Sequence, residues 1–365
     1  MKLVLNRQVF QEALTLAGMV IPRSTPKPIL QCIRLRTQKG KLFLSATDLE
    51  AGIVCEVDQV EIAEEGDAVV PADKVSAIVR ETADETIQLE ESESTLHITT
   101  ADSKYTIYGH DSRQYPSVPE FTGKPDLEAA LEHLKEGITQ TIFAAAREST
   151  RYALNGVLWE ISDKKLYLVA TDGRRLARSA LTLQKAARVP EEKIIVPAKT
   201  MALLEKLPPD PEAVVSVSFS ENRVSVSCGR ITLSSTLVEG NFPKYEDIIP
   251  TDYEKKVVLN TQAAISAVKR AALLVSEDSK GIRISLQNGQ MLFSSRAPET
   301  GEAQIQMTVD YDGPSIEIGF NPQFLLEAFR VITADTFELH LGEPDRPGLI
   351  KSGPNFLYIV MPVHL

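Results

Sequence analysis

An internal repeat constrains the fold of this chain more than any other feature of its sequence. The stretch KLFLSATDLEA at Lys41–Ala51 returns as KLYLVATDGRRLA at Lys165–Ala177, 124 positions later. The stretch KLVLN at Lys2–Asn6 returns as KVVLN at Lys256–Asn260, which is 254 positions, or two steps of 127, further along. A fixed period indicates a fold assembled from copies of one structural unit.

Three further correspondences agree on this period. VPADK at Val70–Lys74 returns as VPAKT at Val196–Thr200, 126 positions later, and as a weaker copy, FNPQF at Phe320–Phe324, 250 positions later. QMLFSS at Gln290–Ser295 stands 125 positions beyond the start of KLYLVA at Lys165. We therefore predict three copies of a unit of about 120 residues, which is an ordinary domain size.

Proline-rich segments mark the expected junctions between the copies. They are QYPSVPEFTGKPD at Gln114–Asp126 and NFPKYEDIIPTDYEKK at Asn241–Lys256, and Pro116 and Pro243 within them are 127 positions apart. Such segments are typical of linkers between domains. The predicted domains are residues 1–120, 125–250 and 252–365.

Apolar periodicity indicates an α+β fold. The stretch at Asn222–Ser235 alternates apolar and polar residues on both sides of Gly229, which predicts a half-buried hairpin. The i, i+3, i+4, i+7 spacing of a helix face occurs in the first and third copies, at Phe10, Ala13, Leu14 and Ala17 and at Ala264, Ala267, Val268 and Ala271. Each copy is thus predicted to contain two βαβββ-like halves, with helices on one face of largely antiparallel sheet.

Composition excludes several classes of protein. The net charge of -11 argues against a chain that coats nucleic acid through overall basicity, so any positive charge that meets DNA must be local. Cys32, Cys55 and Cys228 show no CxxC spacing and sit in apolar strand-like contexts, which favours reduced, buried thiols. The sequence contains no long apolar run and no signal-peptide pattern, so we expect a cytoplasmic protein.

No catalytic, metal or cofactor motif emerges from the sequence. The five histidines show no HExxH pattern, and no GxSxG, GxxxxGK[ST] or GxGxxG motif occurs, so no cofactor or metal is predicted. The segment Gly173-Arg174-Arg175 replaces Leu49-Glu50-Ala51 of the first copy. These arginines suit either a solvated loop or a cradle for a phosphate or carboxylate, and with Asp172 they leave an enzyme acting on phosphorylated substrates open as an alternative.

Basic residues recur on the predicted helices of this acidic protein. Individually they are ordinary solvated side chains, but helices arranged inward in a ring would make them a positive lining around a negative polymer. These residues are Lys74, Arg80, Lys199, Lys206, Lys269 and Arg270.

The C-terminus is unusually apolar. It reads FLYIVMPVHL and carries Met361, Pro362 and Val363 close to its end, where chain termini are normally polar and frayed. Two interpretations stay open, namely a tail tucked into the core and one wall of a groove that captures a peptide.

The whole chain resembles the family of bacterial replicative sliding clamps, the β subunit of DNA polymerase III. The resemblance rests on RYALNGVLWE at Arg151–Glu160, VATDGRRLA at Val169–Ala177, GNFPKYEDIIP at Gly240–Pro250 and the terminal YIVMPVHL. It implies a head-to-tail homodimer whose six domains close into a ring around double-stranded DNA, with helices lining the inside and sheets outside. It also implies a non-catalytic, nucleoid-associated processivity factor whose partners are the replicative polymerase, a clamp loader and repair proteins.

The same resemblance implies three sets of site residues. A hydrophobic peptide pocket between the second and third domains corresponds to Leu154, Thr171, Gly173, Arg175, Leu176, Pro243, Ile248, Ile359, Val360, Met361, Pro362 and Val363. DNA contacts correspond to Arg23, Lys27, Lys74, Arg80, Tyr152, Lys199 and Lys206. The dimer interface corresponds to Tyr105 and Ile107 against Leu273 and Leu274.

Particular roles and departures follow from these positions. Gly173 is expected to leave room for a peptide backbone, and Arg175 to close the rim by hydrogen-bonding a peptide carbonyl. Asp73 and Ala198 stand where relatives often carry a second basic residue, and Ala153 stands where a second aromatic residue can follow. DNA contact is therefore expected to be weaker or differently distributed, and a purely protein-binding repeat scaffold remains a second alternative.

Overall fold

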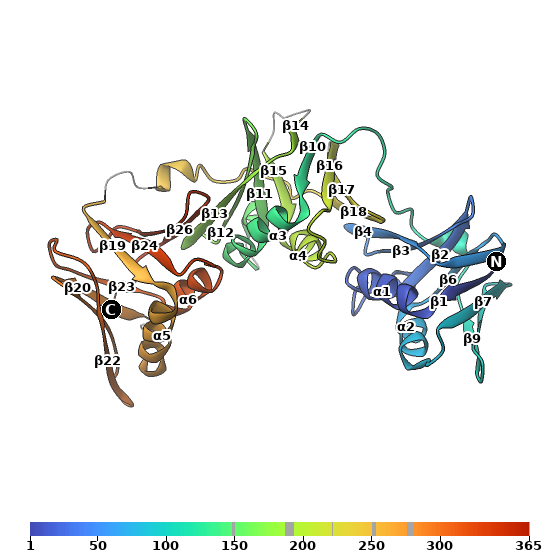
Figure 1. Ribbon diagram of the computed structural model, residues 1–365, viewed down its shortest axis with the longest axis horizontal. Coiled ribbons are helices and arrows are strands. Elements are labelled where there is room, and N and C mark those ends of the chain that lie inside the picture. Colours follow the sequence, from blue (N-terminus) through green and yellow to red (C-terminus); the bar gives the residue numbers. More distant parts are fainter. Residues whose placement is uncertain (148–149, 187–192, 221, 250–252, 276–280, 365) are drawn as a thin grey trace. The chain divides into compact units, whose positions relative to one another are not determined.

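The computed structural model describes residues 1–147, 150–186, 193–220, 222–249, 253–275 and 281–364. These residues form two compact units, drawn in Figure 1. Unit 1 comprises Met1–Glu132, Leu183–Pro190 and Ala202–Leu237, and unit 2 comprises His133–Thr182, Glu191–Met201 and Val238–Leu365. Residues 250–252 of the second predicted linker, and Leu365 of the terminal motif, lie outside the described residues.

The order of elements repeats three times along the chain. The first copy contains β1 (Lys2–Asn6), α1 (Arg7–Gly18), β2 (Cys32–Gln38), β3 (Lys41–Thr47), β4 (Ala51–Val57), β5 (Val60–Glu64), β6 (Asp67–Pro71), α2 (Ala72–Glu81), β7 (Thr86–Ser92), β8 (Thr95–Thr99) and β9 (Lys104–Tyr108). The second contains β10 (Leu127–Ala130), α3 (Leu131–Thr139), β11 (Gly156–Ser162), β12 (Lys165–Thr171), β13 (Arg175–Thr182), β14 (Lys185–Ala186), β15 (Ile194–Pro197), α4 (Ala198–Glu205), β16 (Val214–Ser220), β17 (Arg223–Cys228) and β18 (Ile231–Thr236). The third contains β19 (Lys255–Asn260), α5 (Thr261–Ala271), β20 (Ile282–Gln287), β21 (Gln290–Ala297), β22 (Gly301–Thr308), β23 (Ile316–Phe320), α6 (Pro322–Arg330), β24 (Thr336–Leu341), β25 (Gly348–Ser352) and β26 (Phe356–Val360).

The predicted α+β class and the repeated βαβββ order are confirmed, but the halves exchange their first strands. In the first copy, β1 joins β7, β8 and β9 in one sheet, whereas β6 joins β2, β3 and β4 in the other. The second and third copies follow the same rule, and every strand pairing among the described residues is antiparallel. Each half therefore completes the sheet of the other, and in the second copy these two sheets belong to different units.

Neighbouring copies share continuous sheets. In unit 1, β18 of the second copy pairs with β4 of the first, so nine strands run in the order β14-β10-β16-β17-β18-β4-β3-β2-β6. In unit 2, β26 of the third copy pairs with β13 of the second, giving eight strands in the order β15-β11-β12-β13-β26-β25-β24-β19. The last strand of one copy thus always meets the fourth strand of the copy before it.

The repeated asparagine of KLVLN and KVVLN begins the helix that follows. The Asn6 side-chain oxygen accepts hydrogen bonds from the backbone N–H groups of Gln8 (3.0 Å) and Val9 (3.2 Å) at the start of α1. Asn260 accepts one from Ala263 (3.0 Å) at the start of α5. Asparagine is among the preferred helix caps because it satisfies N–H groups that have no partner within the helix.

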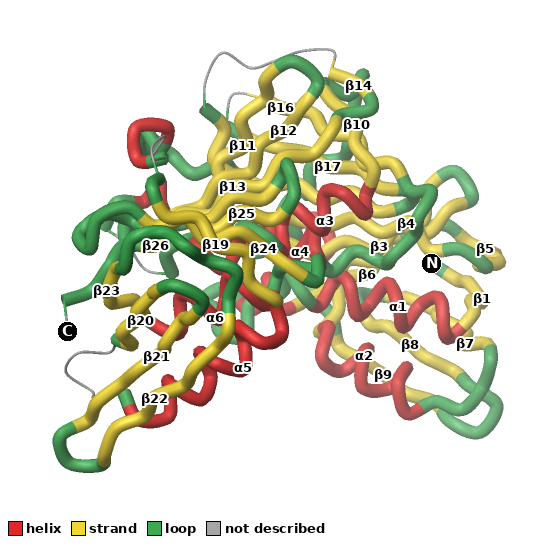
Figure 2. The backbone as a smooth tube through the Cα atoms, turned by 60° about the vertical axis from the view of Figure 1, so that its left-hand side comes forward, coloured by secondary structure: helices red, strands yellow, loops and turns green. Residues whose placement is uncertain are grey.

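The predicted helix faces are buried as expected. All eight apolar positions named for the first and third copies are buried on α1 and α5, which pack on β3 and β4 and on β21 and β22, respectively. Within unit 1, α1 packs beside α2, and within unit 2, α5 packs beside α6 (Figure 2). The predicted hairpin of β17 and β18 is also confirmed, with Val224, Val226 and Cys228 buried.

The cysteines are buried and not joined in disulfides, as predicted. Burial raises the pKa of the Cys55 thiol to about 12, and burial together with the Asp73 charge raises that of Cys32 to about 11. Among the described residues, no helix has the length and apolar character needed to cross a membrane.

Candidate functional site

The turn between β12 and β13 is built by hydrogen bonds from Thr171 and Asp172. The Thr171 hydroxyl donates to the Arg175 carbonyl oxygen (2.6 Å) and accepts from the Gly173 N–H (3.1 Å). One carboxylate oxygen of Asp172 accepts from the backbone N–H groups of Arg174 (2.9 Å) and Arg175 (3.1 Å). Side chains that bond to the backbone two or three residues on are typical of such turns.

The first copy forms the same turn from its own ATD segment. The Thr47 hydroxyl donates to the Ala51 carbonyl oxygen (2.7 Å), and Asp48 accepts from the N–H groups of Glu50 (3.0 Å) and Ala51 (2.7 Å). Leu49 adopts φ 82°, close to the 89° of Gly173. The doubled phrase therefore specifies a turn, and the turn does not depend on glycine.

Gly173 faces open space. A methyl group built on its Cα would meet no atom of the described chain within 4 Å. Since Leu49 holds the equivalent position in the first copy, packing within this chain does not require the glycine at 173. Gly173 therefore leaves open space at the surface of the turn.

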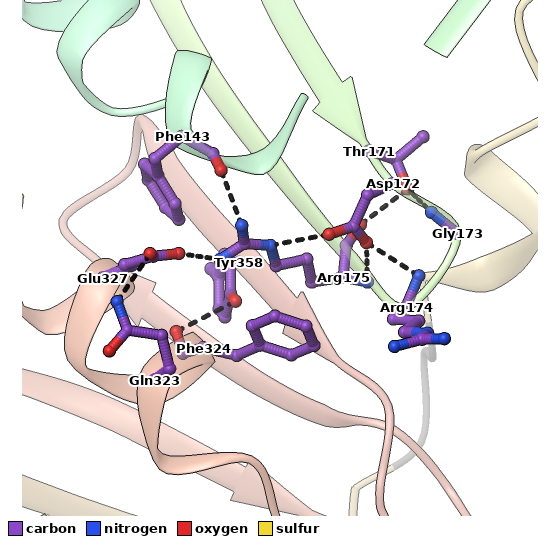
Figure 3. A network of polar contacts seen from close by, with 10 residues as sticks. All are labelled: Phe143, Thr171, Asp172, Gly173, Arg174, Arg175, Gln323, Phe324, Glu327 and Tyr358. Carbon is purple, nitrogen blue, oxygen red and sulfur yellow. Dashed lines mark hydrogen bonds and ion pairs between the residues drawn. The ribbon is translucent and has the colours of Figure 1, made fainter. Parts of the chain in front are cut away.

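Arg175 was expected to close an open rim, but its side chain is largely buried. Its side chain is 9% exposed, and its guanidinium donates to Asp172 (3.0 Å), to Glu327 on α6 and to the Phe143 carbonyl oxygen (2.7 Å), as Figure 3 shows. The Phe324 and Phe143 rings lie 4.4 and 5.5 Å from its central carbon. These acceptors engage three of the five guanidinium N–H groups, so the predicted bond to a peptide carbonyl stays a prediction.

The electrostatics of this cluster keep Arg175 charged. Burial alone would lower the pKa of the guanidinium, but the hydrogen bond to Glu327 and the charges of Glu327 and Asp172 raise the pKa above its ordinary value. Burial has the opposite effect on Tyr358 and raises its pKa, because it disfavours the charged phenolate. The Tyr358 hydroxyl donates to the Phe324 carbonyl oxygen (3.0 Å). The cluster fastens β13, β26 and α6 together.

The turn also holds the end of the chain. Residues Arg175 and Leu176 of β13 pair with Val360 and Ile359 of β26, and the Met361 N–H donates to the Arg174 carbonyl oxygen (2.9 Å). Met361 is 38% exposed at the point where the strand ends. The apolar C-terminus thus has a buried strand, as the tucked-tail interpretation expects, and an exposed end beside the turn; the groove interpretation stays a prediction.

The predicted pocket residues separate by burial. Leu154, Thr171, Leu176, Ile359 and Val360 are buried; Arg175, Pro243, Pro362 and Val363 are half-buried; Gly173, Ile248 and Met361 are exposed. Leu176 and Ile359 share a hydrophobic cluster with Phe242 and Tyr245 of the linker. The buried residues thus belong to the core, and Gly173, Ile248 and Met361 lie at the surface.

The sequence analysis missed the framework residues Phe143, Phe324, Glu327 and Tyr245. The Tyr245 hydroxyl donates to Glu160, and burial followed by this bond raises the tyrosine pKa. The signal for Tyr245 was available, because it lies in the quoted linker motif. Glu327 gave none, since it looks like any charged helix residue.

Asp172 does not have the surroundings of a catalytic carboxylate. One of its oxygens accepts the two turn N–H groups and the other accepts from Arg175. The enzyme alternative needed these groups to face a substrate. Both oxygens of Asp172 instead accept hydrogen bonds from the turn and from the Arg175 side chain.

Two cavities lie in unit 2. One of about 470 Å³ is lined by residues that include Lys199 at the start of α4, Asn155, Phe143 and Glu327. The other, of about 150 Å³, lies between α3 and β13 and includes Gln140 and Ser179, whose hydroxyl donates to the glutamine (2.7 Å). Lys199, a predicted DNA contact, thus lines the same cavity as Phe143 and Glu327, two hydrogen-bond partners of Arg175.

The predicted DNA-contacting side chains are all exposed, in one unit or the other. Unit 1 carries Arg23, Lys27, Lys74, Arg80 and Lys206, and unit 2 carries Tyr152 and Lys199. Lys74 pairs with Asp73 (3.3 Å) and Arg80 with Glu81 (3.2 Å), so part of the helix charge is locally balanced. Exposed pairs of this kind are weak and leave the cations available to a phosphate.

The predicted interface residues lie at or near sheet edges. β9 ends the five-stranded sheet of unit 1, and β22 ends the four-stranded sheet of unit 2. Leu273 is 79% exposed and Tyr105 is also exposed, but Ile107 is only 8% exposed. The Ile107 side chain packs within unit 1, and the pairing of its strand with a partner stays a prediction.

Three domain families match the chain. They are DNA polymerase III beta subunit, N-terminal domain, over residues 1–119; central domain, over residues 128–244; and C-terminal domain, over residues 246–364. The beta sliding clamp of Pseudomonas putida is 34% identical over 371 residues, covering 100% of both chains. Together the matches extend over nearly the whole chain.

Solved structures agree with these matches over the full length. The crystal structure of the Pseudomonas aeruginosa sliding clamp bound to griselimycin has a TM-score of 0.94 at 32% identity and covers 100% of both chains. That of the DNA polymerase III beta subunit from Thermotoga maritima has a TM-score of 0.91 at 26% identity and covers 100% of this chain and 99% of its own.

Proposed function

The chain belongs to the family of DNA polymerase III beta subunits, the DNA sliding clamps, and on that premise we propose that two copies of it close into a ring around duplex DNA. The ring tethers the replicative polymerase and other replication and repair proteins to the template. It contributes no catalysis of its own, and it works in the cytoplasm at the nucleoid, where such DNA lies.

One observation carries the proposal of a closed ring. The last strand of each later copy pairs with the fourth strand of the copy before it, as β18 does with β4 and β26 with β13. The same rule leaves β9 and β22, each with one strand neighbour among the described residues. Open edges of this kind attract a further strand. Pairing β9 of one chain with β22 of a second chain continues this strand rule head to tail from chain to chain. Two such contacts join the six repeats of two chains into a closed ring.

The experiment that tests this closure is a pair of substitutions read out by native mass. Leu273→Asp adds a charge to an exposed residue beside the proposed contact, and we expect the dimer to dissociate into chains of 40.2 kDa. Val258→Ser is the matched control, because Val258 is also exposed and apolar but lies on β19. Equal dissociation in both variants, or in neither, would contradict the assignment of these edges.

DNA is held by enclosure and by sparse contacts to phosphate. The chain has a net charge of -11, so a few exposed cations on α2, α4 and the loop at Arg23 and Lys27 supply the local attraction. Contacts to phosphates fix no base sequence, which permits sliding. Because counterion release scales with the number of phosphate contacts and these contacts are few, binding to linear DNA should be weak and should fall only modestly with salt.

The partner peptide occupies the groove at the end of β26. Met361 and Ile248 are exposed apolar residues, Gly173 faces open space, and Leu176 and Ile359 on the paired strands are buried. Short peptides with Leu and Phe anchors gain affinity by displacing water from such a preformed site. Replacing Met361 by alanine should weaken binding of such a peptide, including one from a polymerase subunit or a clamp loader, without changing the dimer.

A further inference from the structure

We propose that Glu327 is a positioning residue for the peptide groove, acting through Arg175 on the turn and on the chain end that form its wall. The inference rests on the proposed peptide-binding function, and it adds a residue from α6 that does not itself line the groove. Figure 3 shows the carboxylate facing the guanidinium from the side opposite Asp172.

The contacts form a continuous chain from α6 to the groove. Glu327 accepts a hydrogen bond from Arg175, whose Nε donates to Asp172 (3.0 Å). Asp172 holds the backbone N–H groups of the turn, and the Arg174 carbonyl oxygen accepts from the Met361 N–H (2.9 Å). A shift of Arg175 therefore moves the turn and the chain end together.

The junction between the first and second copies provides an internal control for this interpretation. The positions 124 residues before Arg175 and Glu327 are Ala51 and Leu203. Ala51 still completes a turn with the same backbone hydrogen bonds. The ion pair is thus not needed to form the turn, and both of its members are present only where the second copy meets the third.

Glu327 is held less tightly in the ion pair than Arg175. Its side chain is 23% exposed and lines the cavity of about 470 Å³, so water can replace Arg175 as the hydrogen-bond donor to its carboxylate. Its other oxygen accepts from Gln323 (2.8 Å) on the same helix. Arg175 is less free, because its guanidinium lies between the Phe324 and Phe143 rings.

The test is Glu327→Gln in the full chain, since glutamine keeps the size and removes the charge. We expect the affinity for a fluorescent short peptide with Leu and Phe anchors to fall about tenfold, within the usual range for coupled residues. We also expect hydrogen exchange at the Met361 amide to rise by a similar factor, while exchange at the Leu49 amide of the first-copy turn stays unchanged. Glu317→Gln is the control, because Glu317 pairs with Arg283 (3.5 Å) at an exposed site and makes no contact with Arg175.

A double-mutant cycle distinguishes positioning from a general loss of stability. In an Arg175→Ala background, Glu327→Gln should have no further effect on peptide affinity. Additive effects, or wild-type affinity and Met361 exchange in the single variant, would overturn the proposal. The exchange measurement needs no peptide, so a wild-type chain that binds no peptide would refute the proposed groove while the exchange result still decides the positioning role.

Discussion

Replacing Arg175 by alanine measures whether this guanidinium belongs to the fold or to the ligand site. Removing one partner of a buried ion pair costs about 3–5 kcal/mol, because the remaining charges are left without compensation. The Asp172 and Glu327 side chains are 20% and 23% exposed, so water replaces part of the lost interaction. We therefore expect the free energy of unfolding of unit 2 to fall by about 2–3 kcal/mol.

The assay is thermal unfolding followed by calorimetry, with Arg174→Ala as the matched control. A loss of this size lowers the Tm of a unit of this length by about 4–12 °C. Arg174 is exposed and enters the turn only through its backbone, so its variant should stay within about 0.5 kcal/mol of the wild type. An Arg175 variant with unchanged Tm and abolished peptide binding would refute the reasoning, because the guanidinium would then serve the peptide and not the fold.

Three other outcomes follow from single residues. Gly173→Leu should fold with a loss of about 1–2 kcal/mol, because Leu49 already adopts this turn, yet should block peptide binding; calorimetry and a peptide titration measure both. Gly109→Ala should lower the Tm strongly, since its new methyl group would lie 2.3 Å from the Val69 carbonyl oxygen. Denaturant unfolding measures the loss of stability, and a small loss would show that the strand moves aside. Cys55, with its pKa raised to about 12, should resist iodoacetamide at pH 9 until denaturant is added, and mass spectrometry of the folded chain would reveal any early alkylation. Because the raised pKa favours the neutral thiol in the folded state, the stability that this residue contributes is lost as pH rises above about 8.5, the ordinary thiol pKa.

The sequence predicted the repeat and the local structure well, because both depend on periodicity. The helix faces at Phe10 and Ala264 and the hairpin around Gly229 follow from the spacing of apolar residues. Which strand lies beside which did not follow, because alternation fixes the faces of a strand and not its neighbours. The exchange of β1 and β6, and the pairing of β13 with β26, are therefore findings of the structure.

The site was only partly predictable for a related reason. The ATD turn and the apolar chain end lie side by side, as the predicted pocket requires, but the partner of Arg175 lies 152 positions away on α6. Nothing in the local sequence of Glu327 distinguishes it from a solvated residue. The contrast between Gly173 and Leu49 was also misleading, since both residues adopt the same turn and differ in the space they leave outside it.

The most direct test of the central claim is topological. Labelled chain would be placed on nicked circular DNA by a bacterial clamp loader, washed at high salt, and followed before and after the circle is cut once. A ring that encloses the duplex is predicted to stay on the circle through the salt wash and to slide off within minutes of cutting. Loss from the intact circle at high salt, or equal retention on cut and uncut DNA, would contradict enclosure.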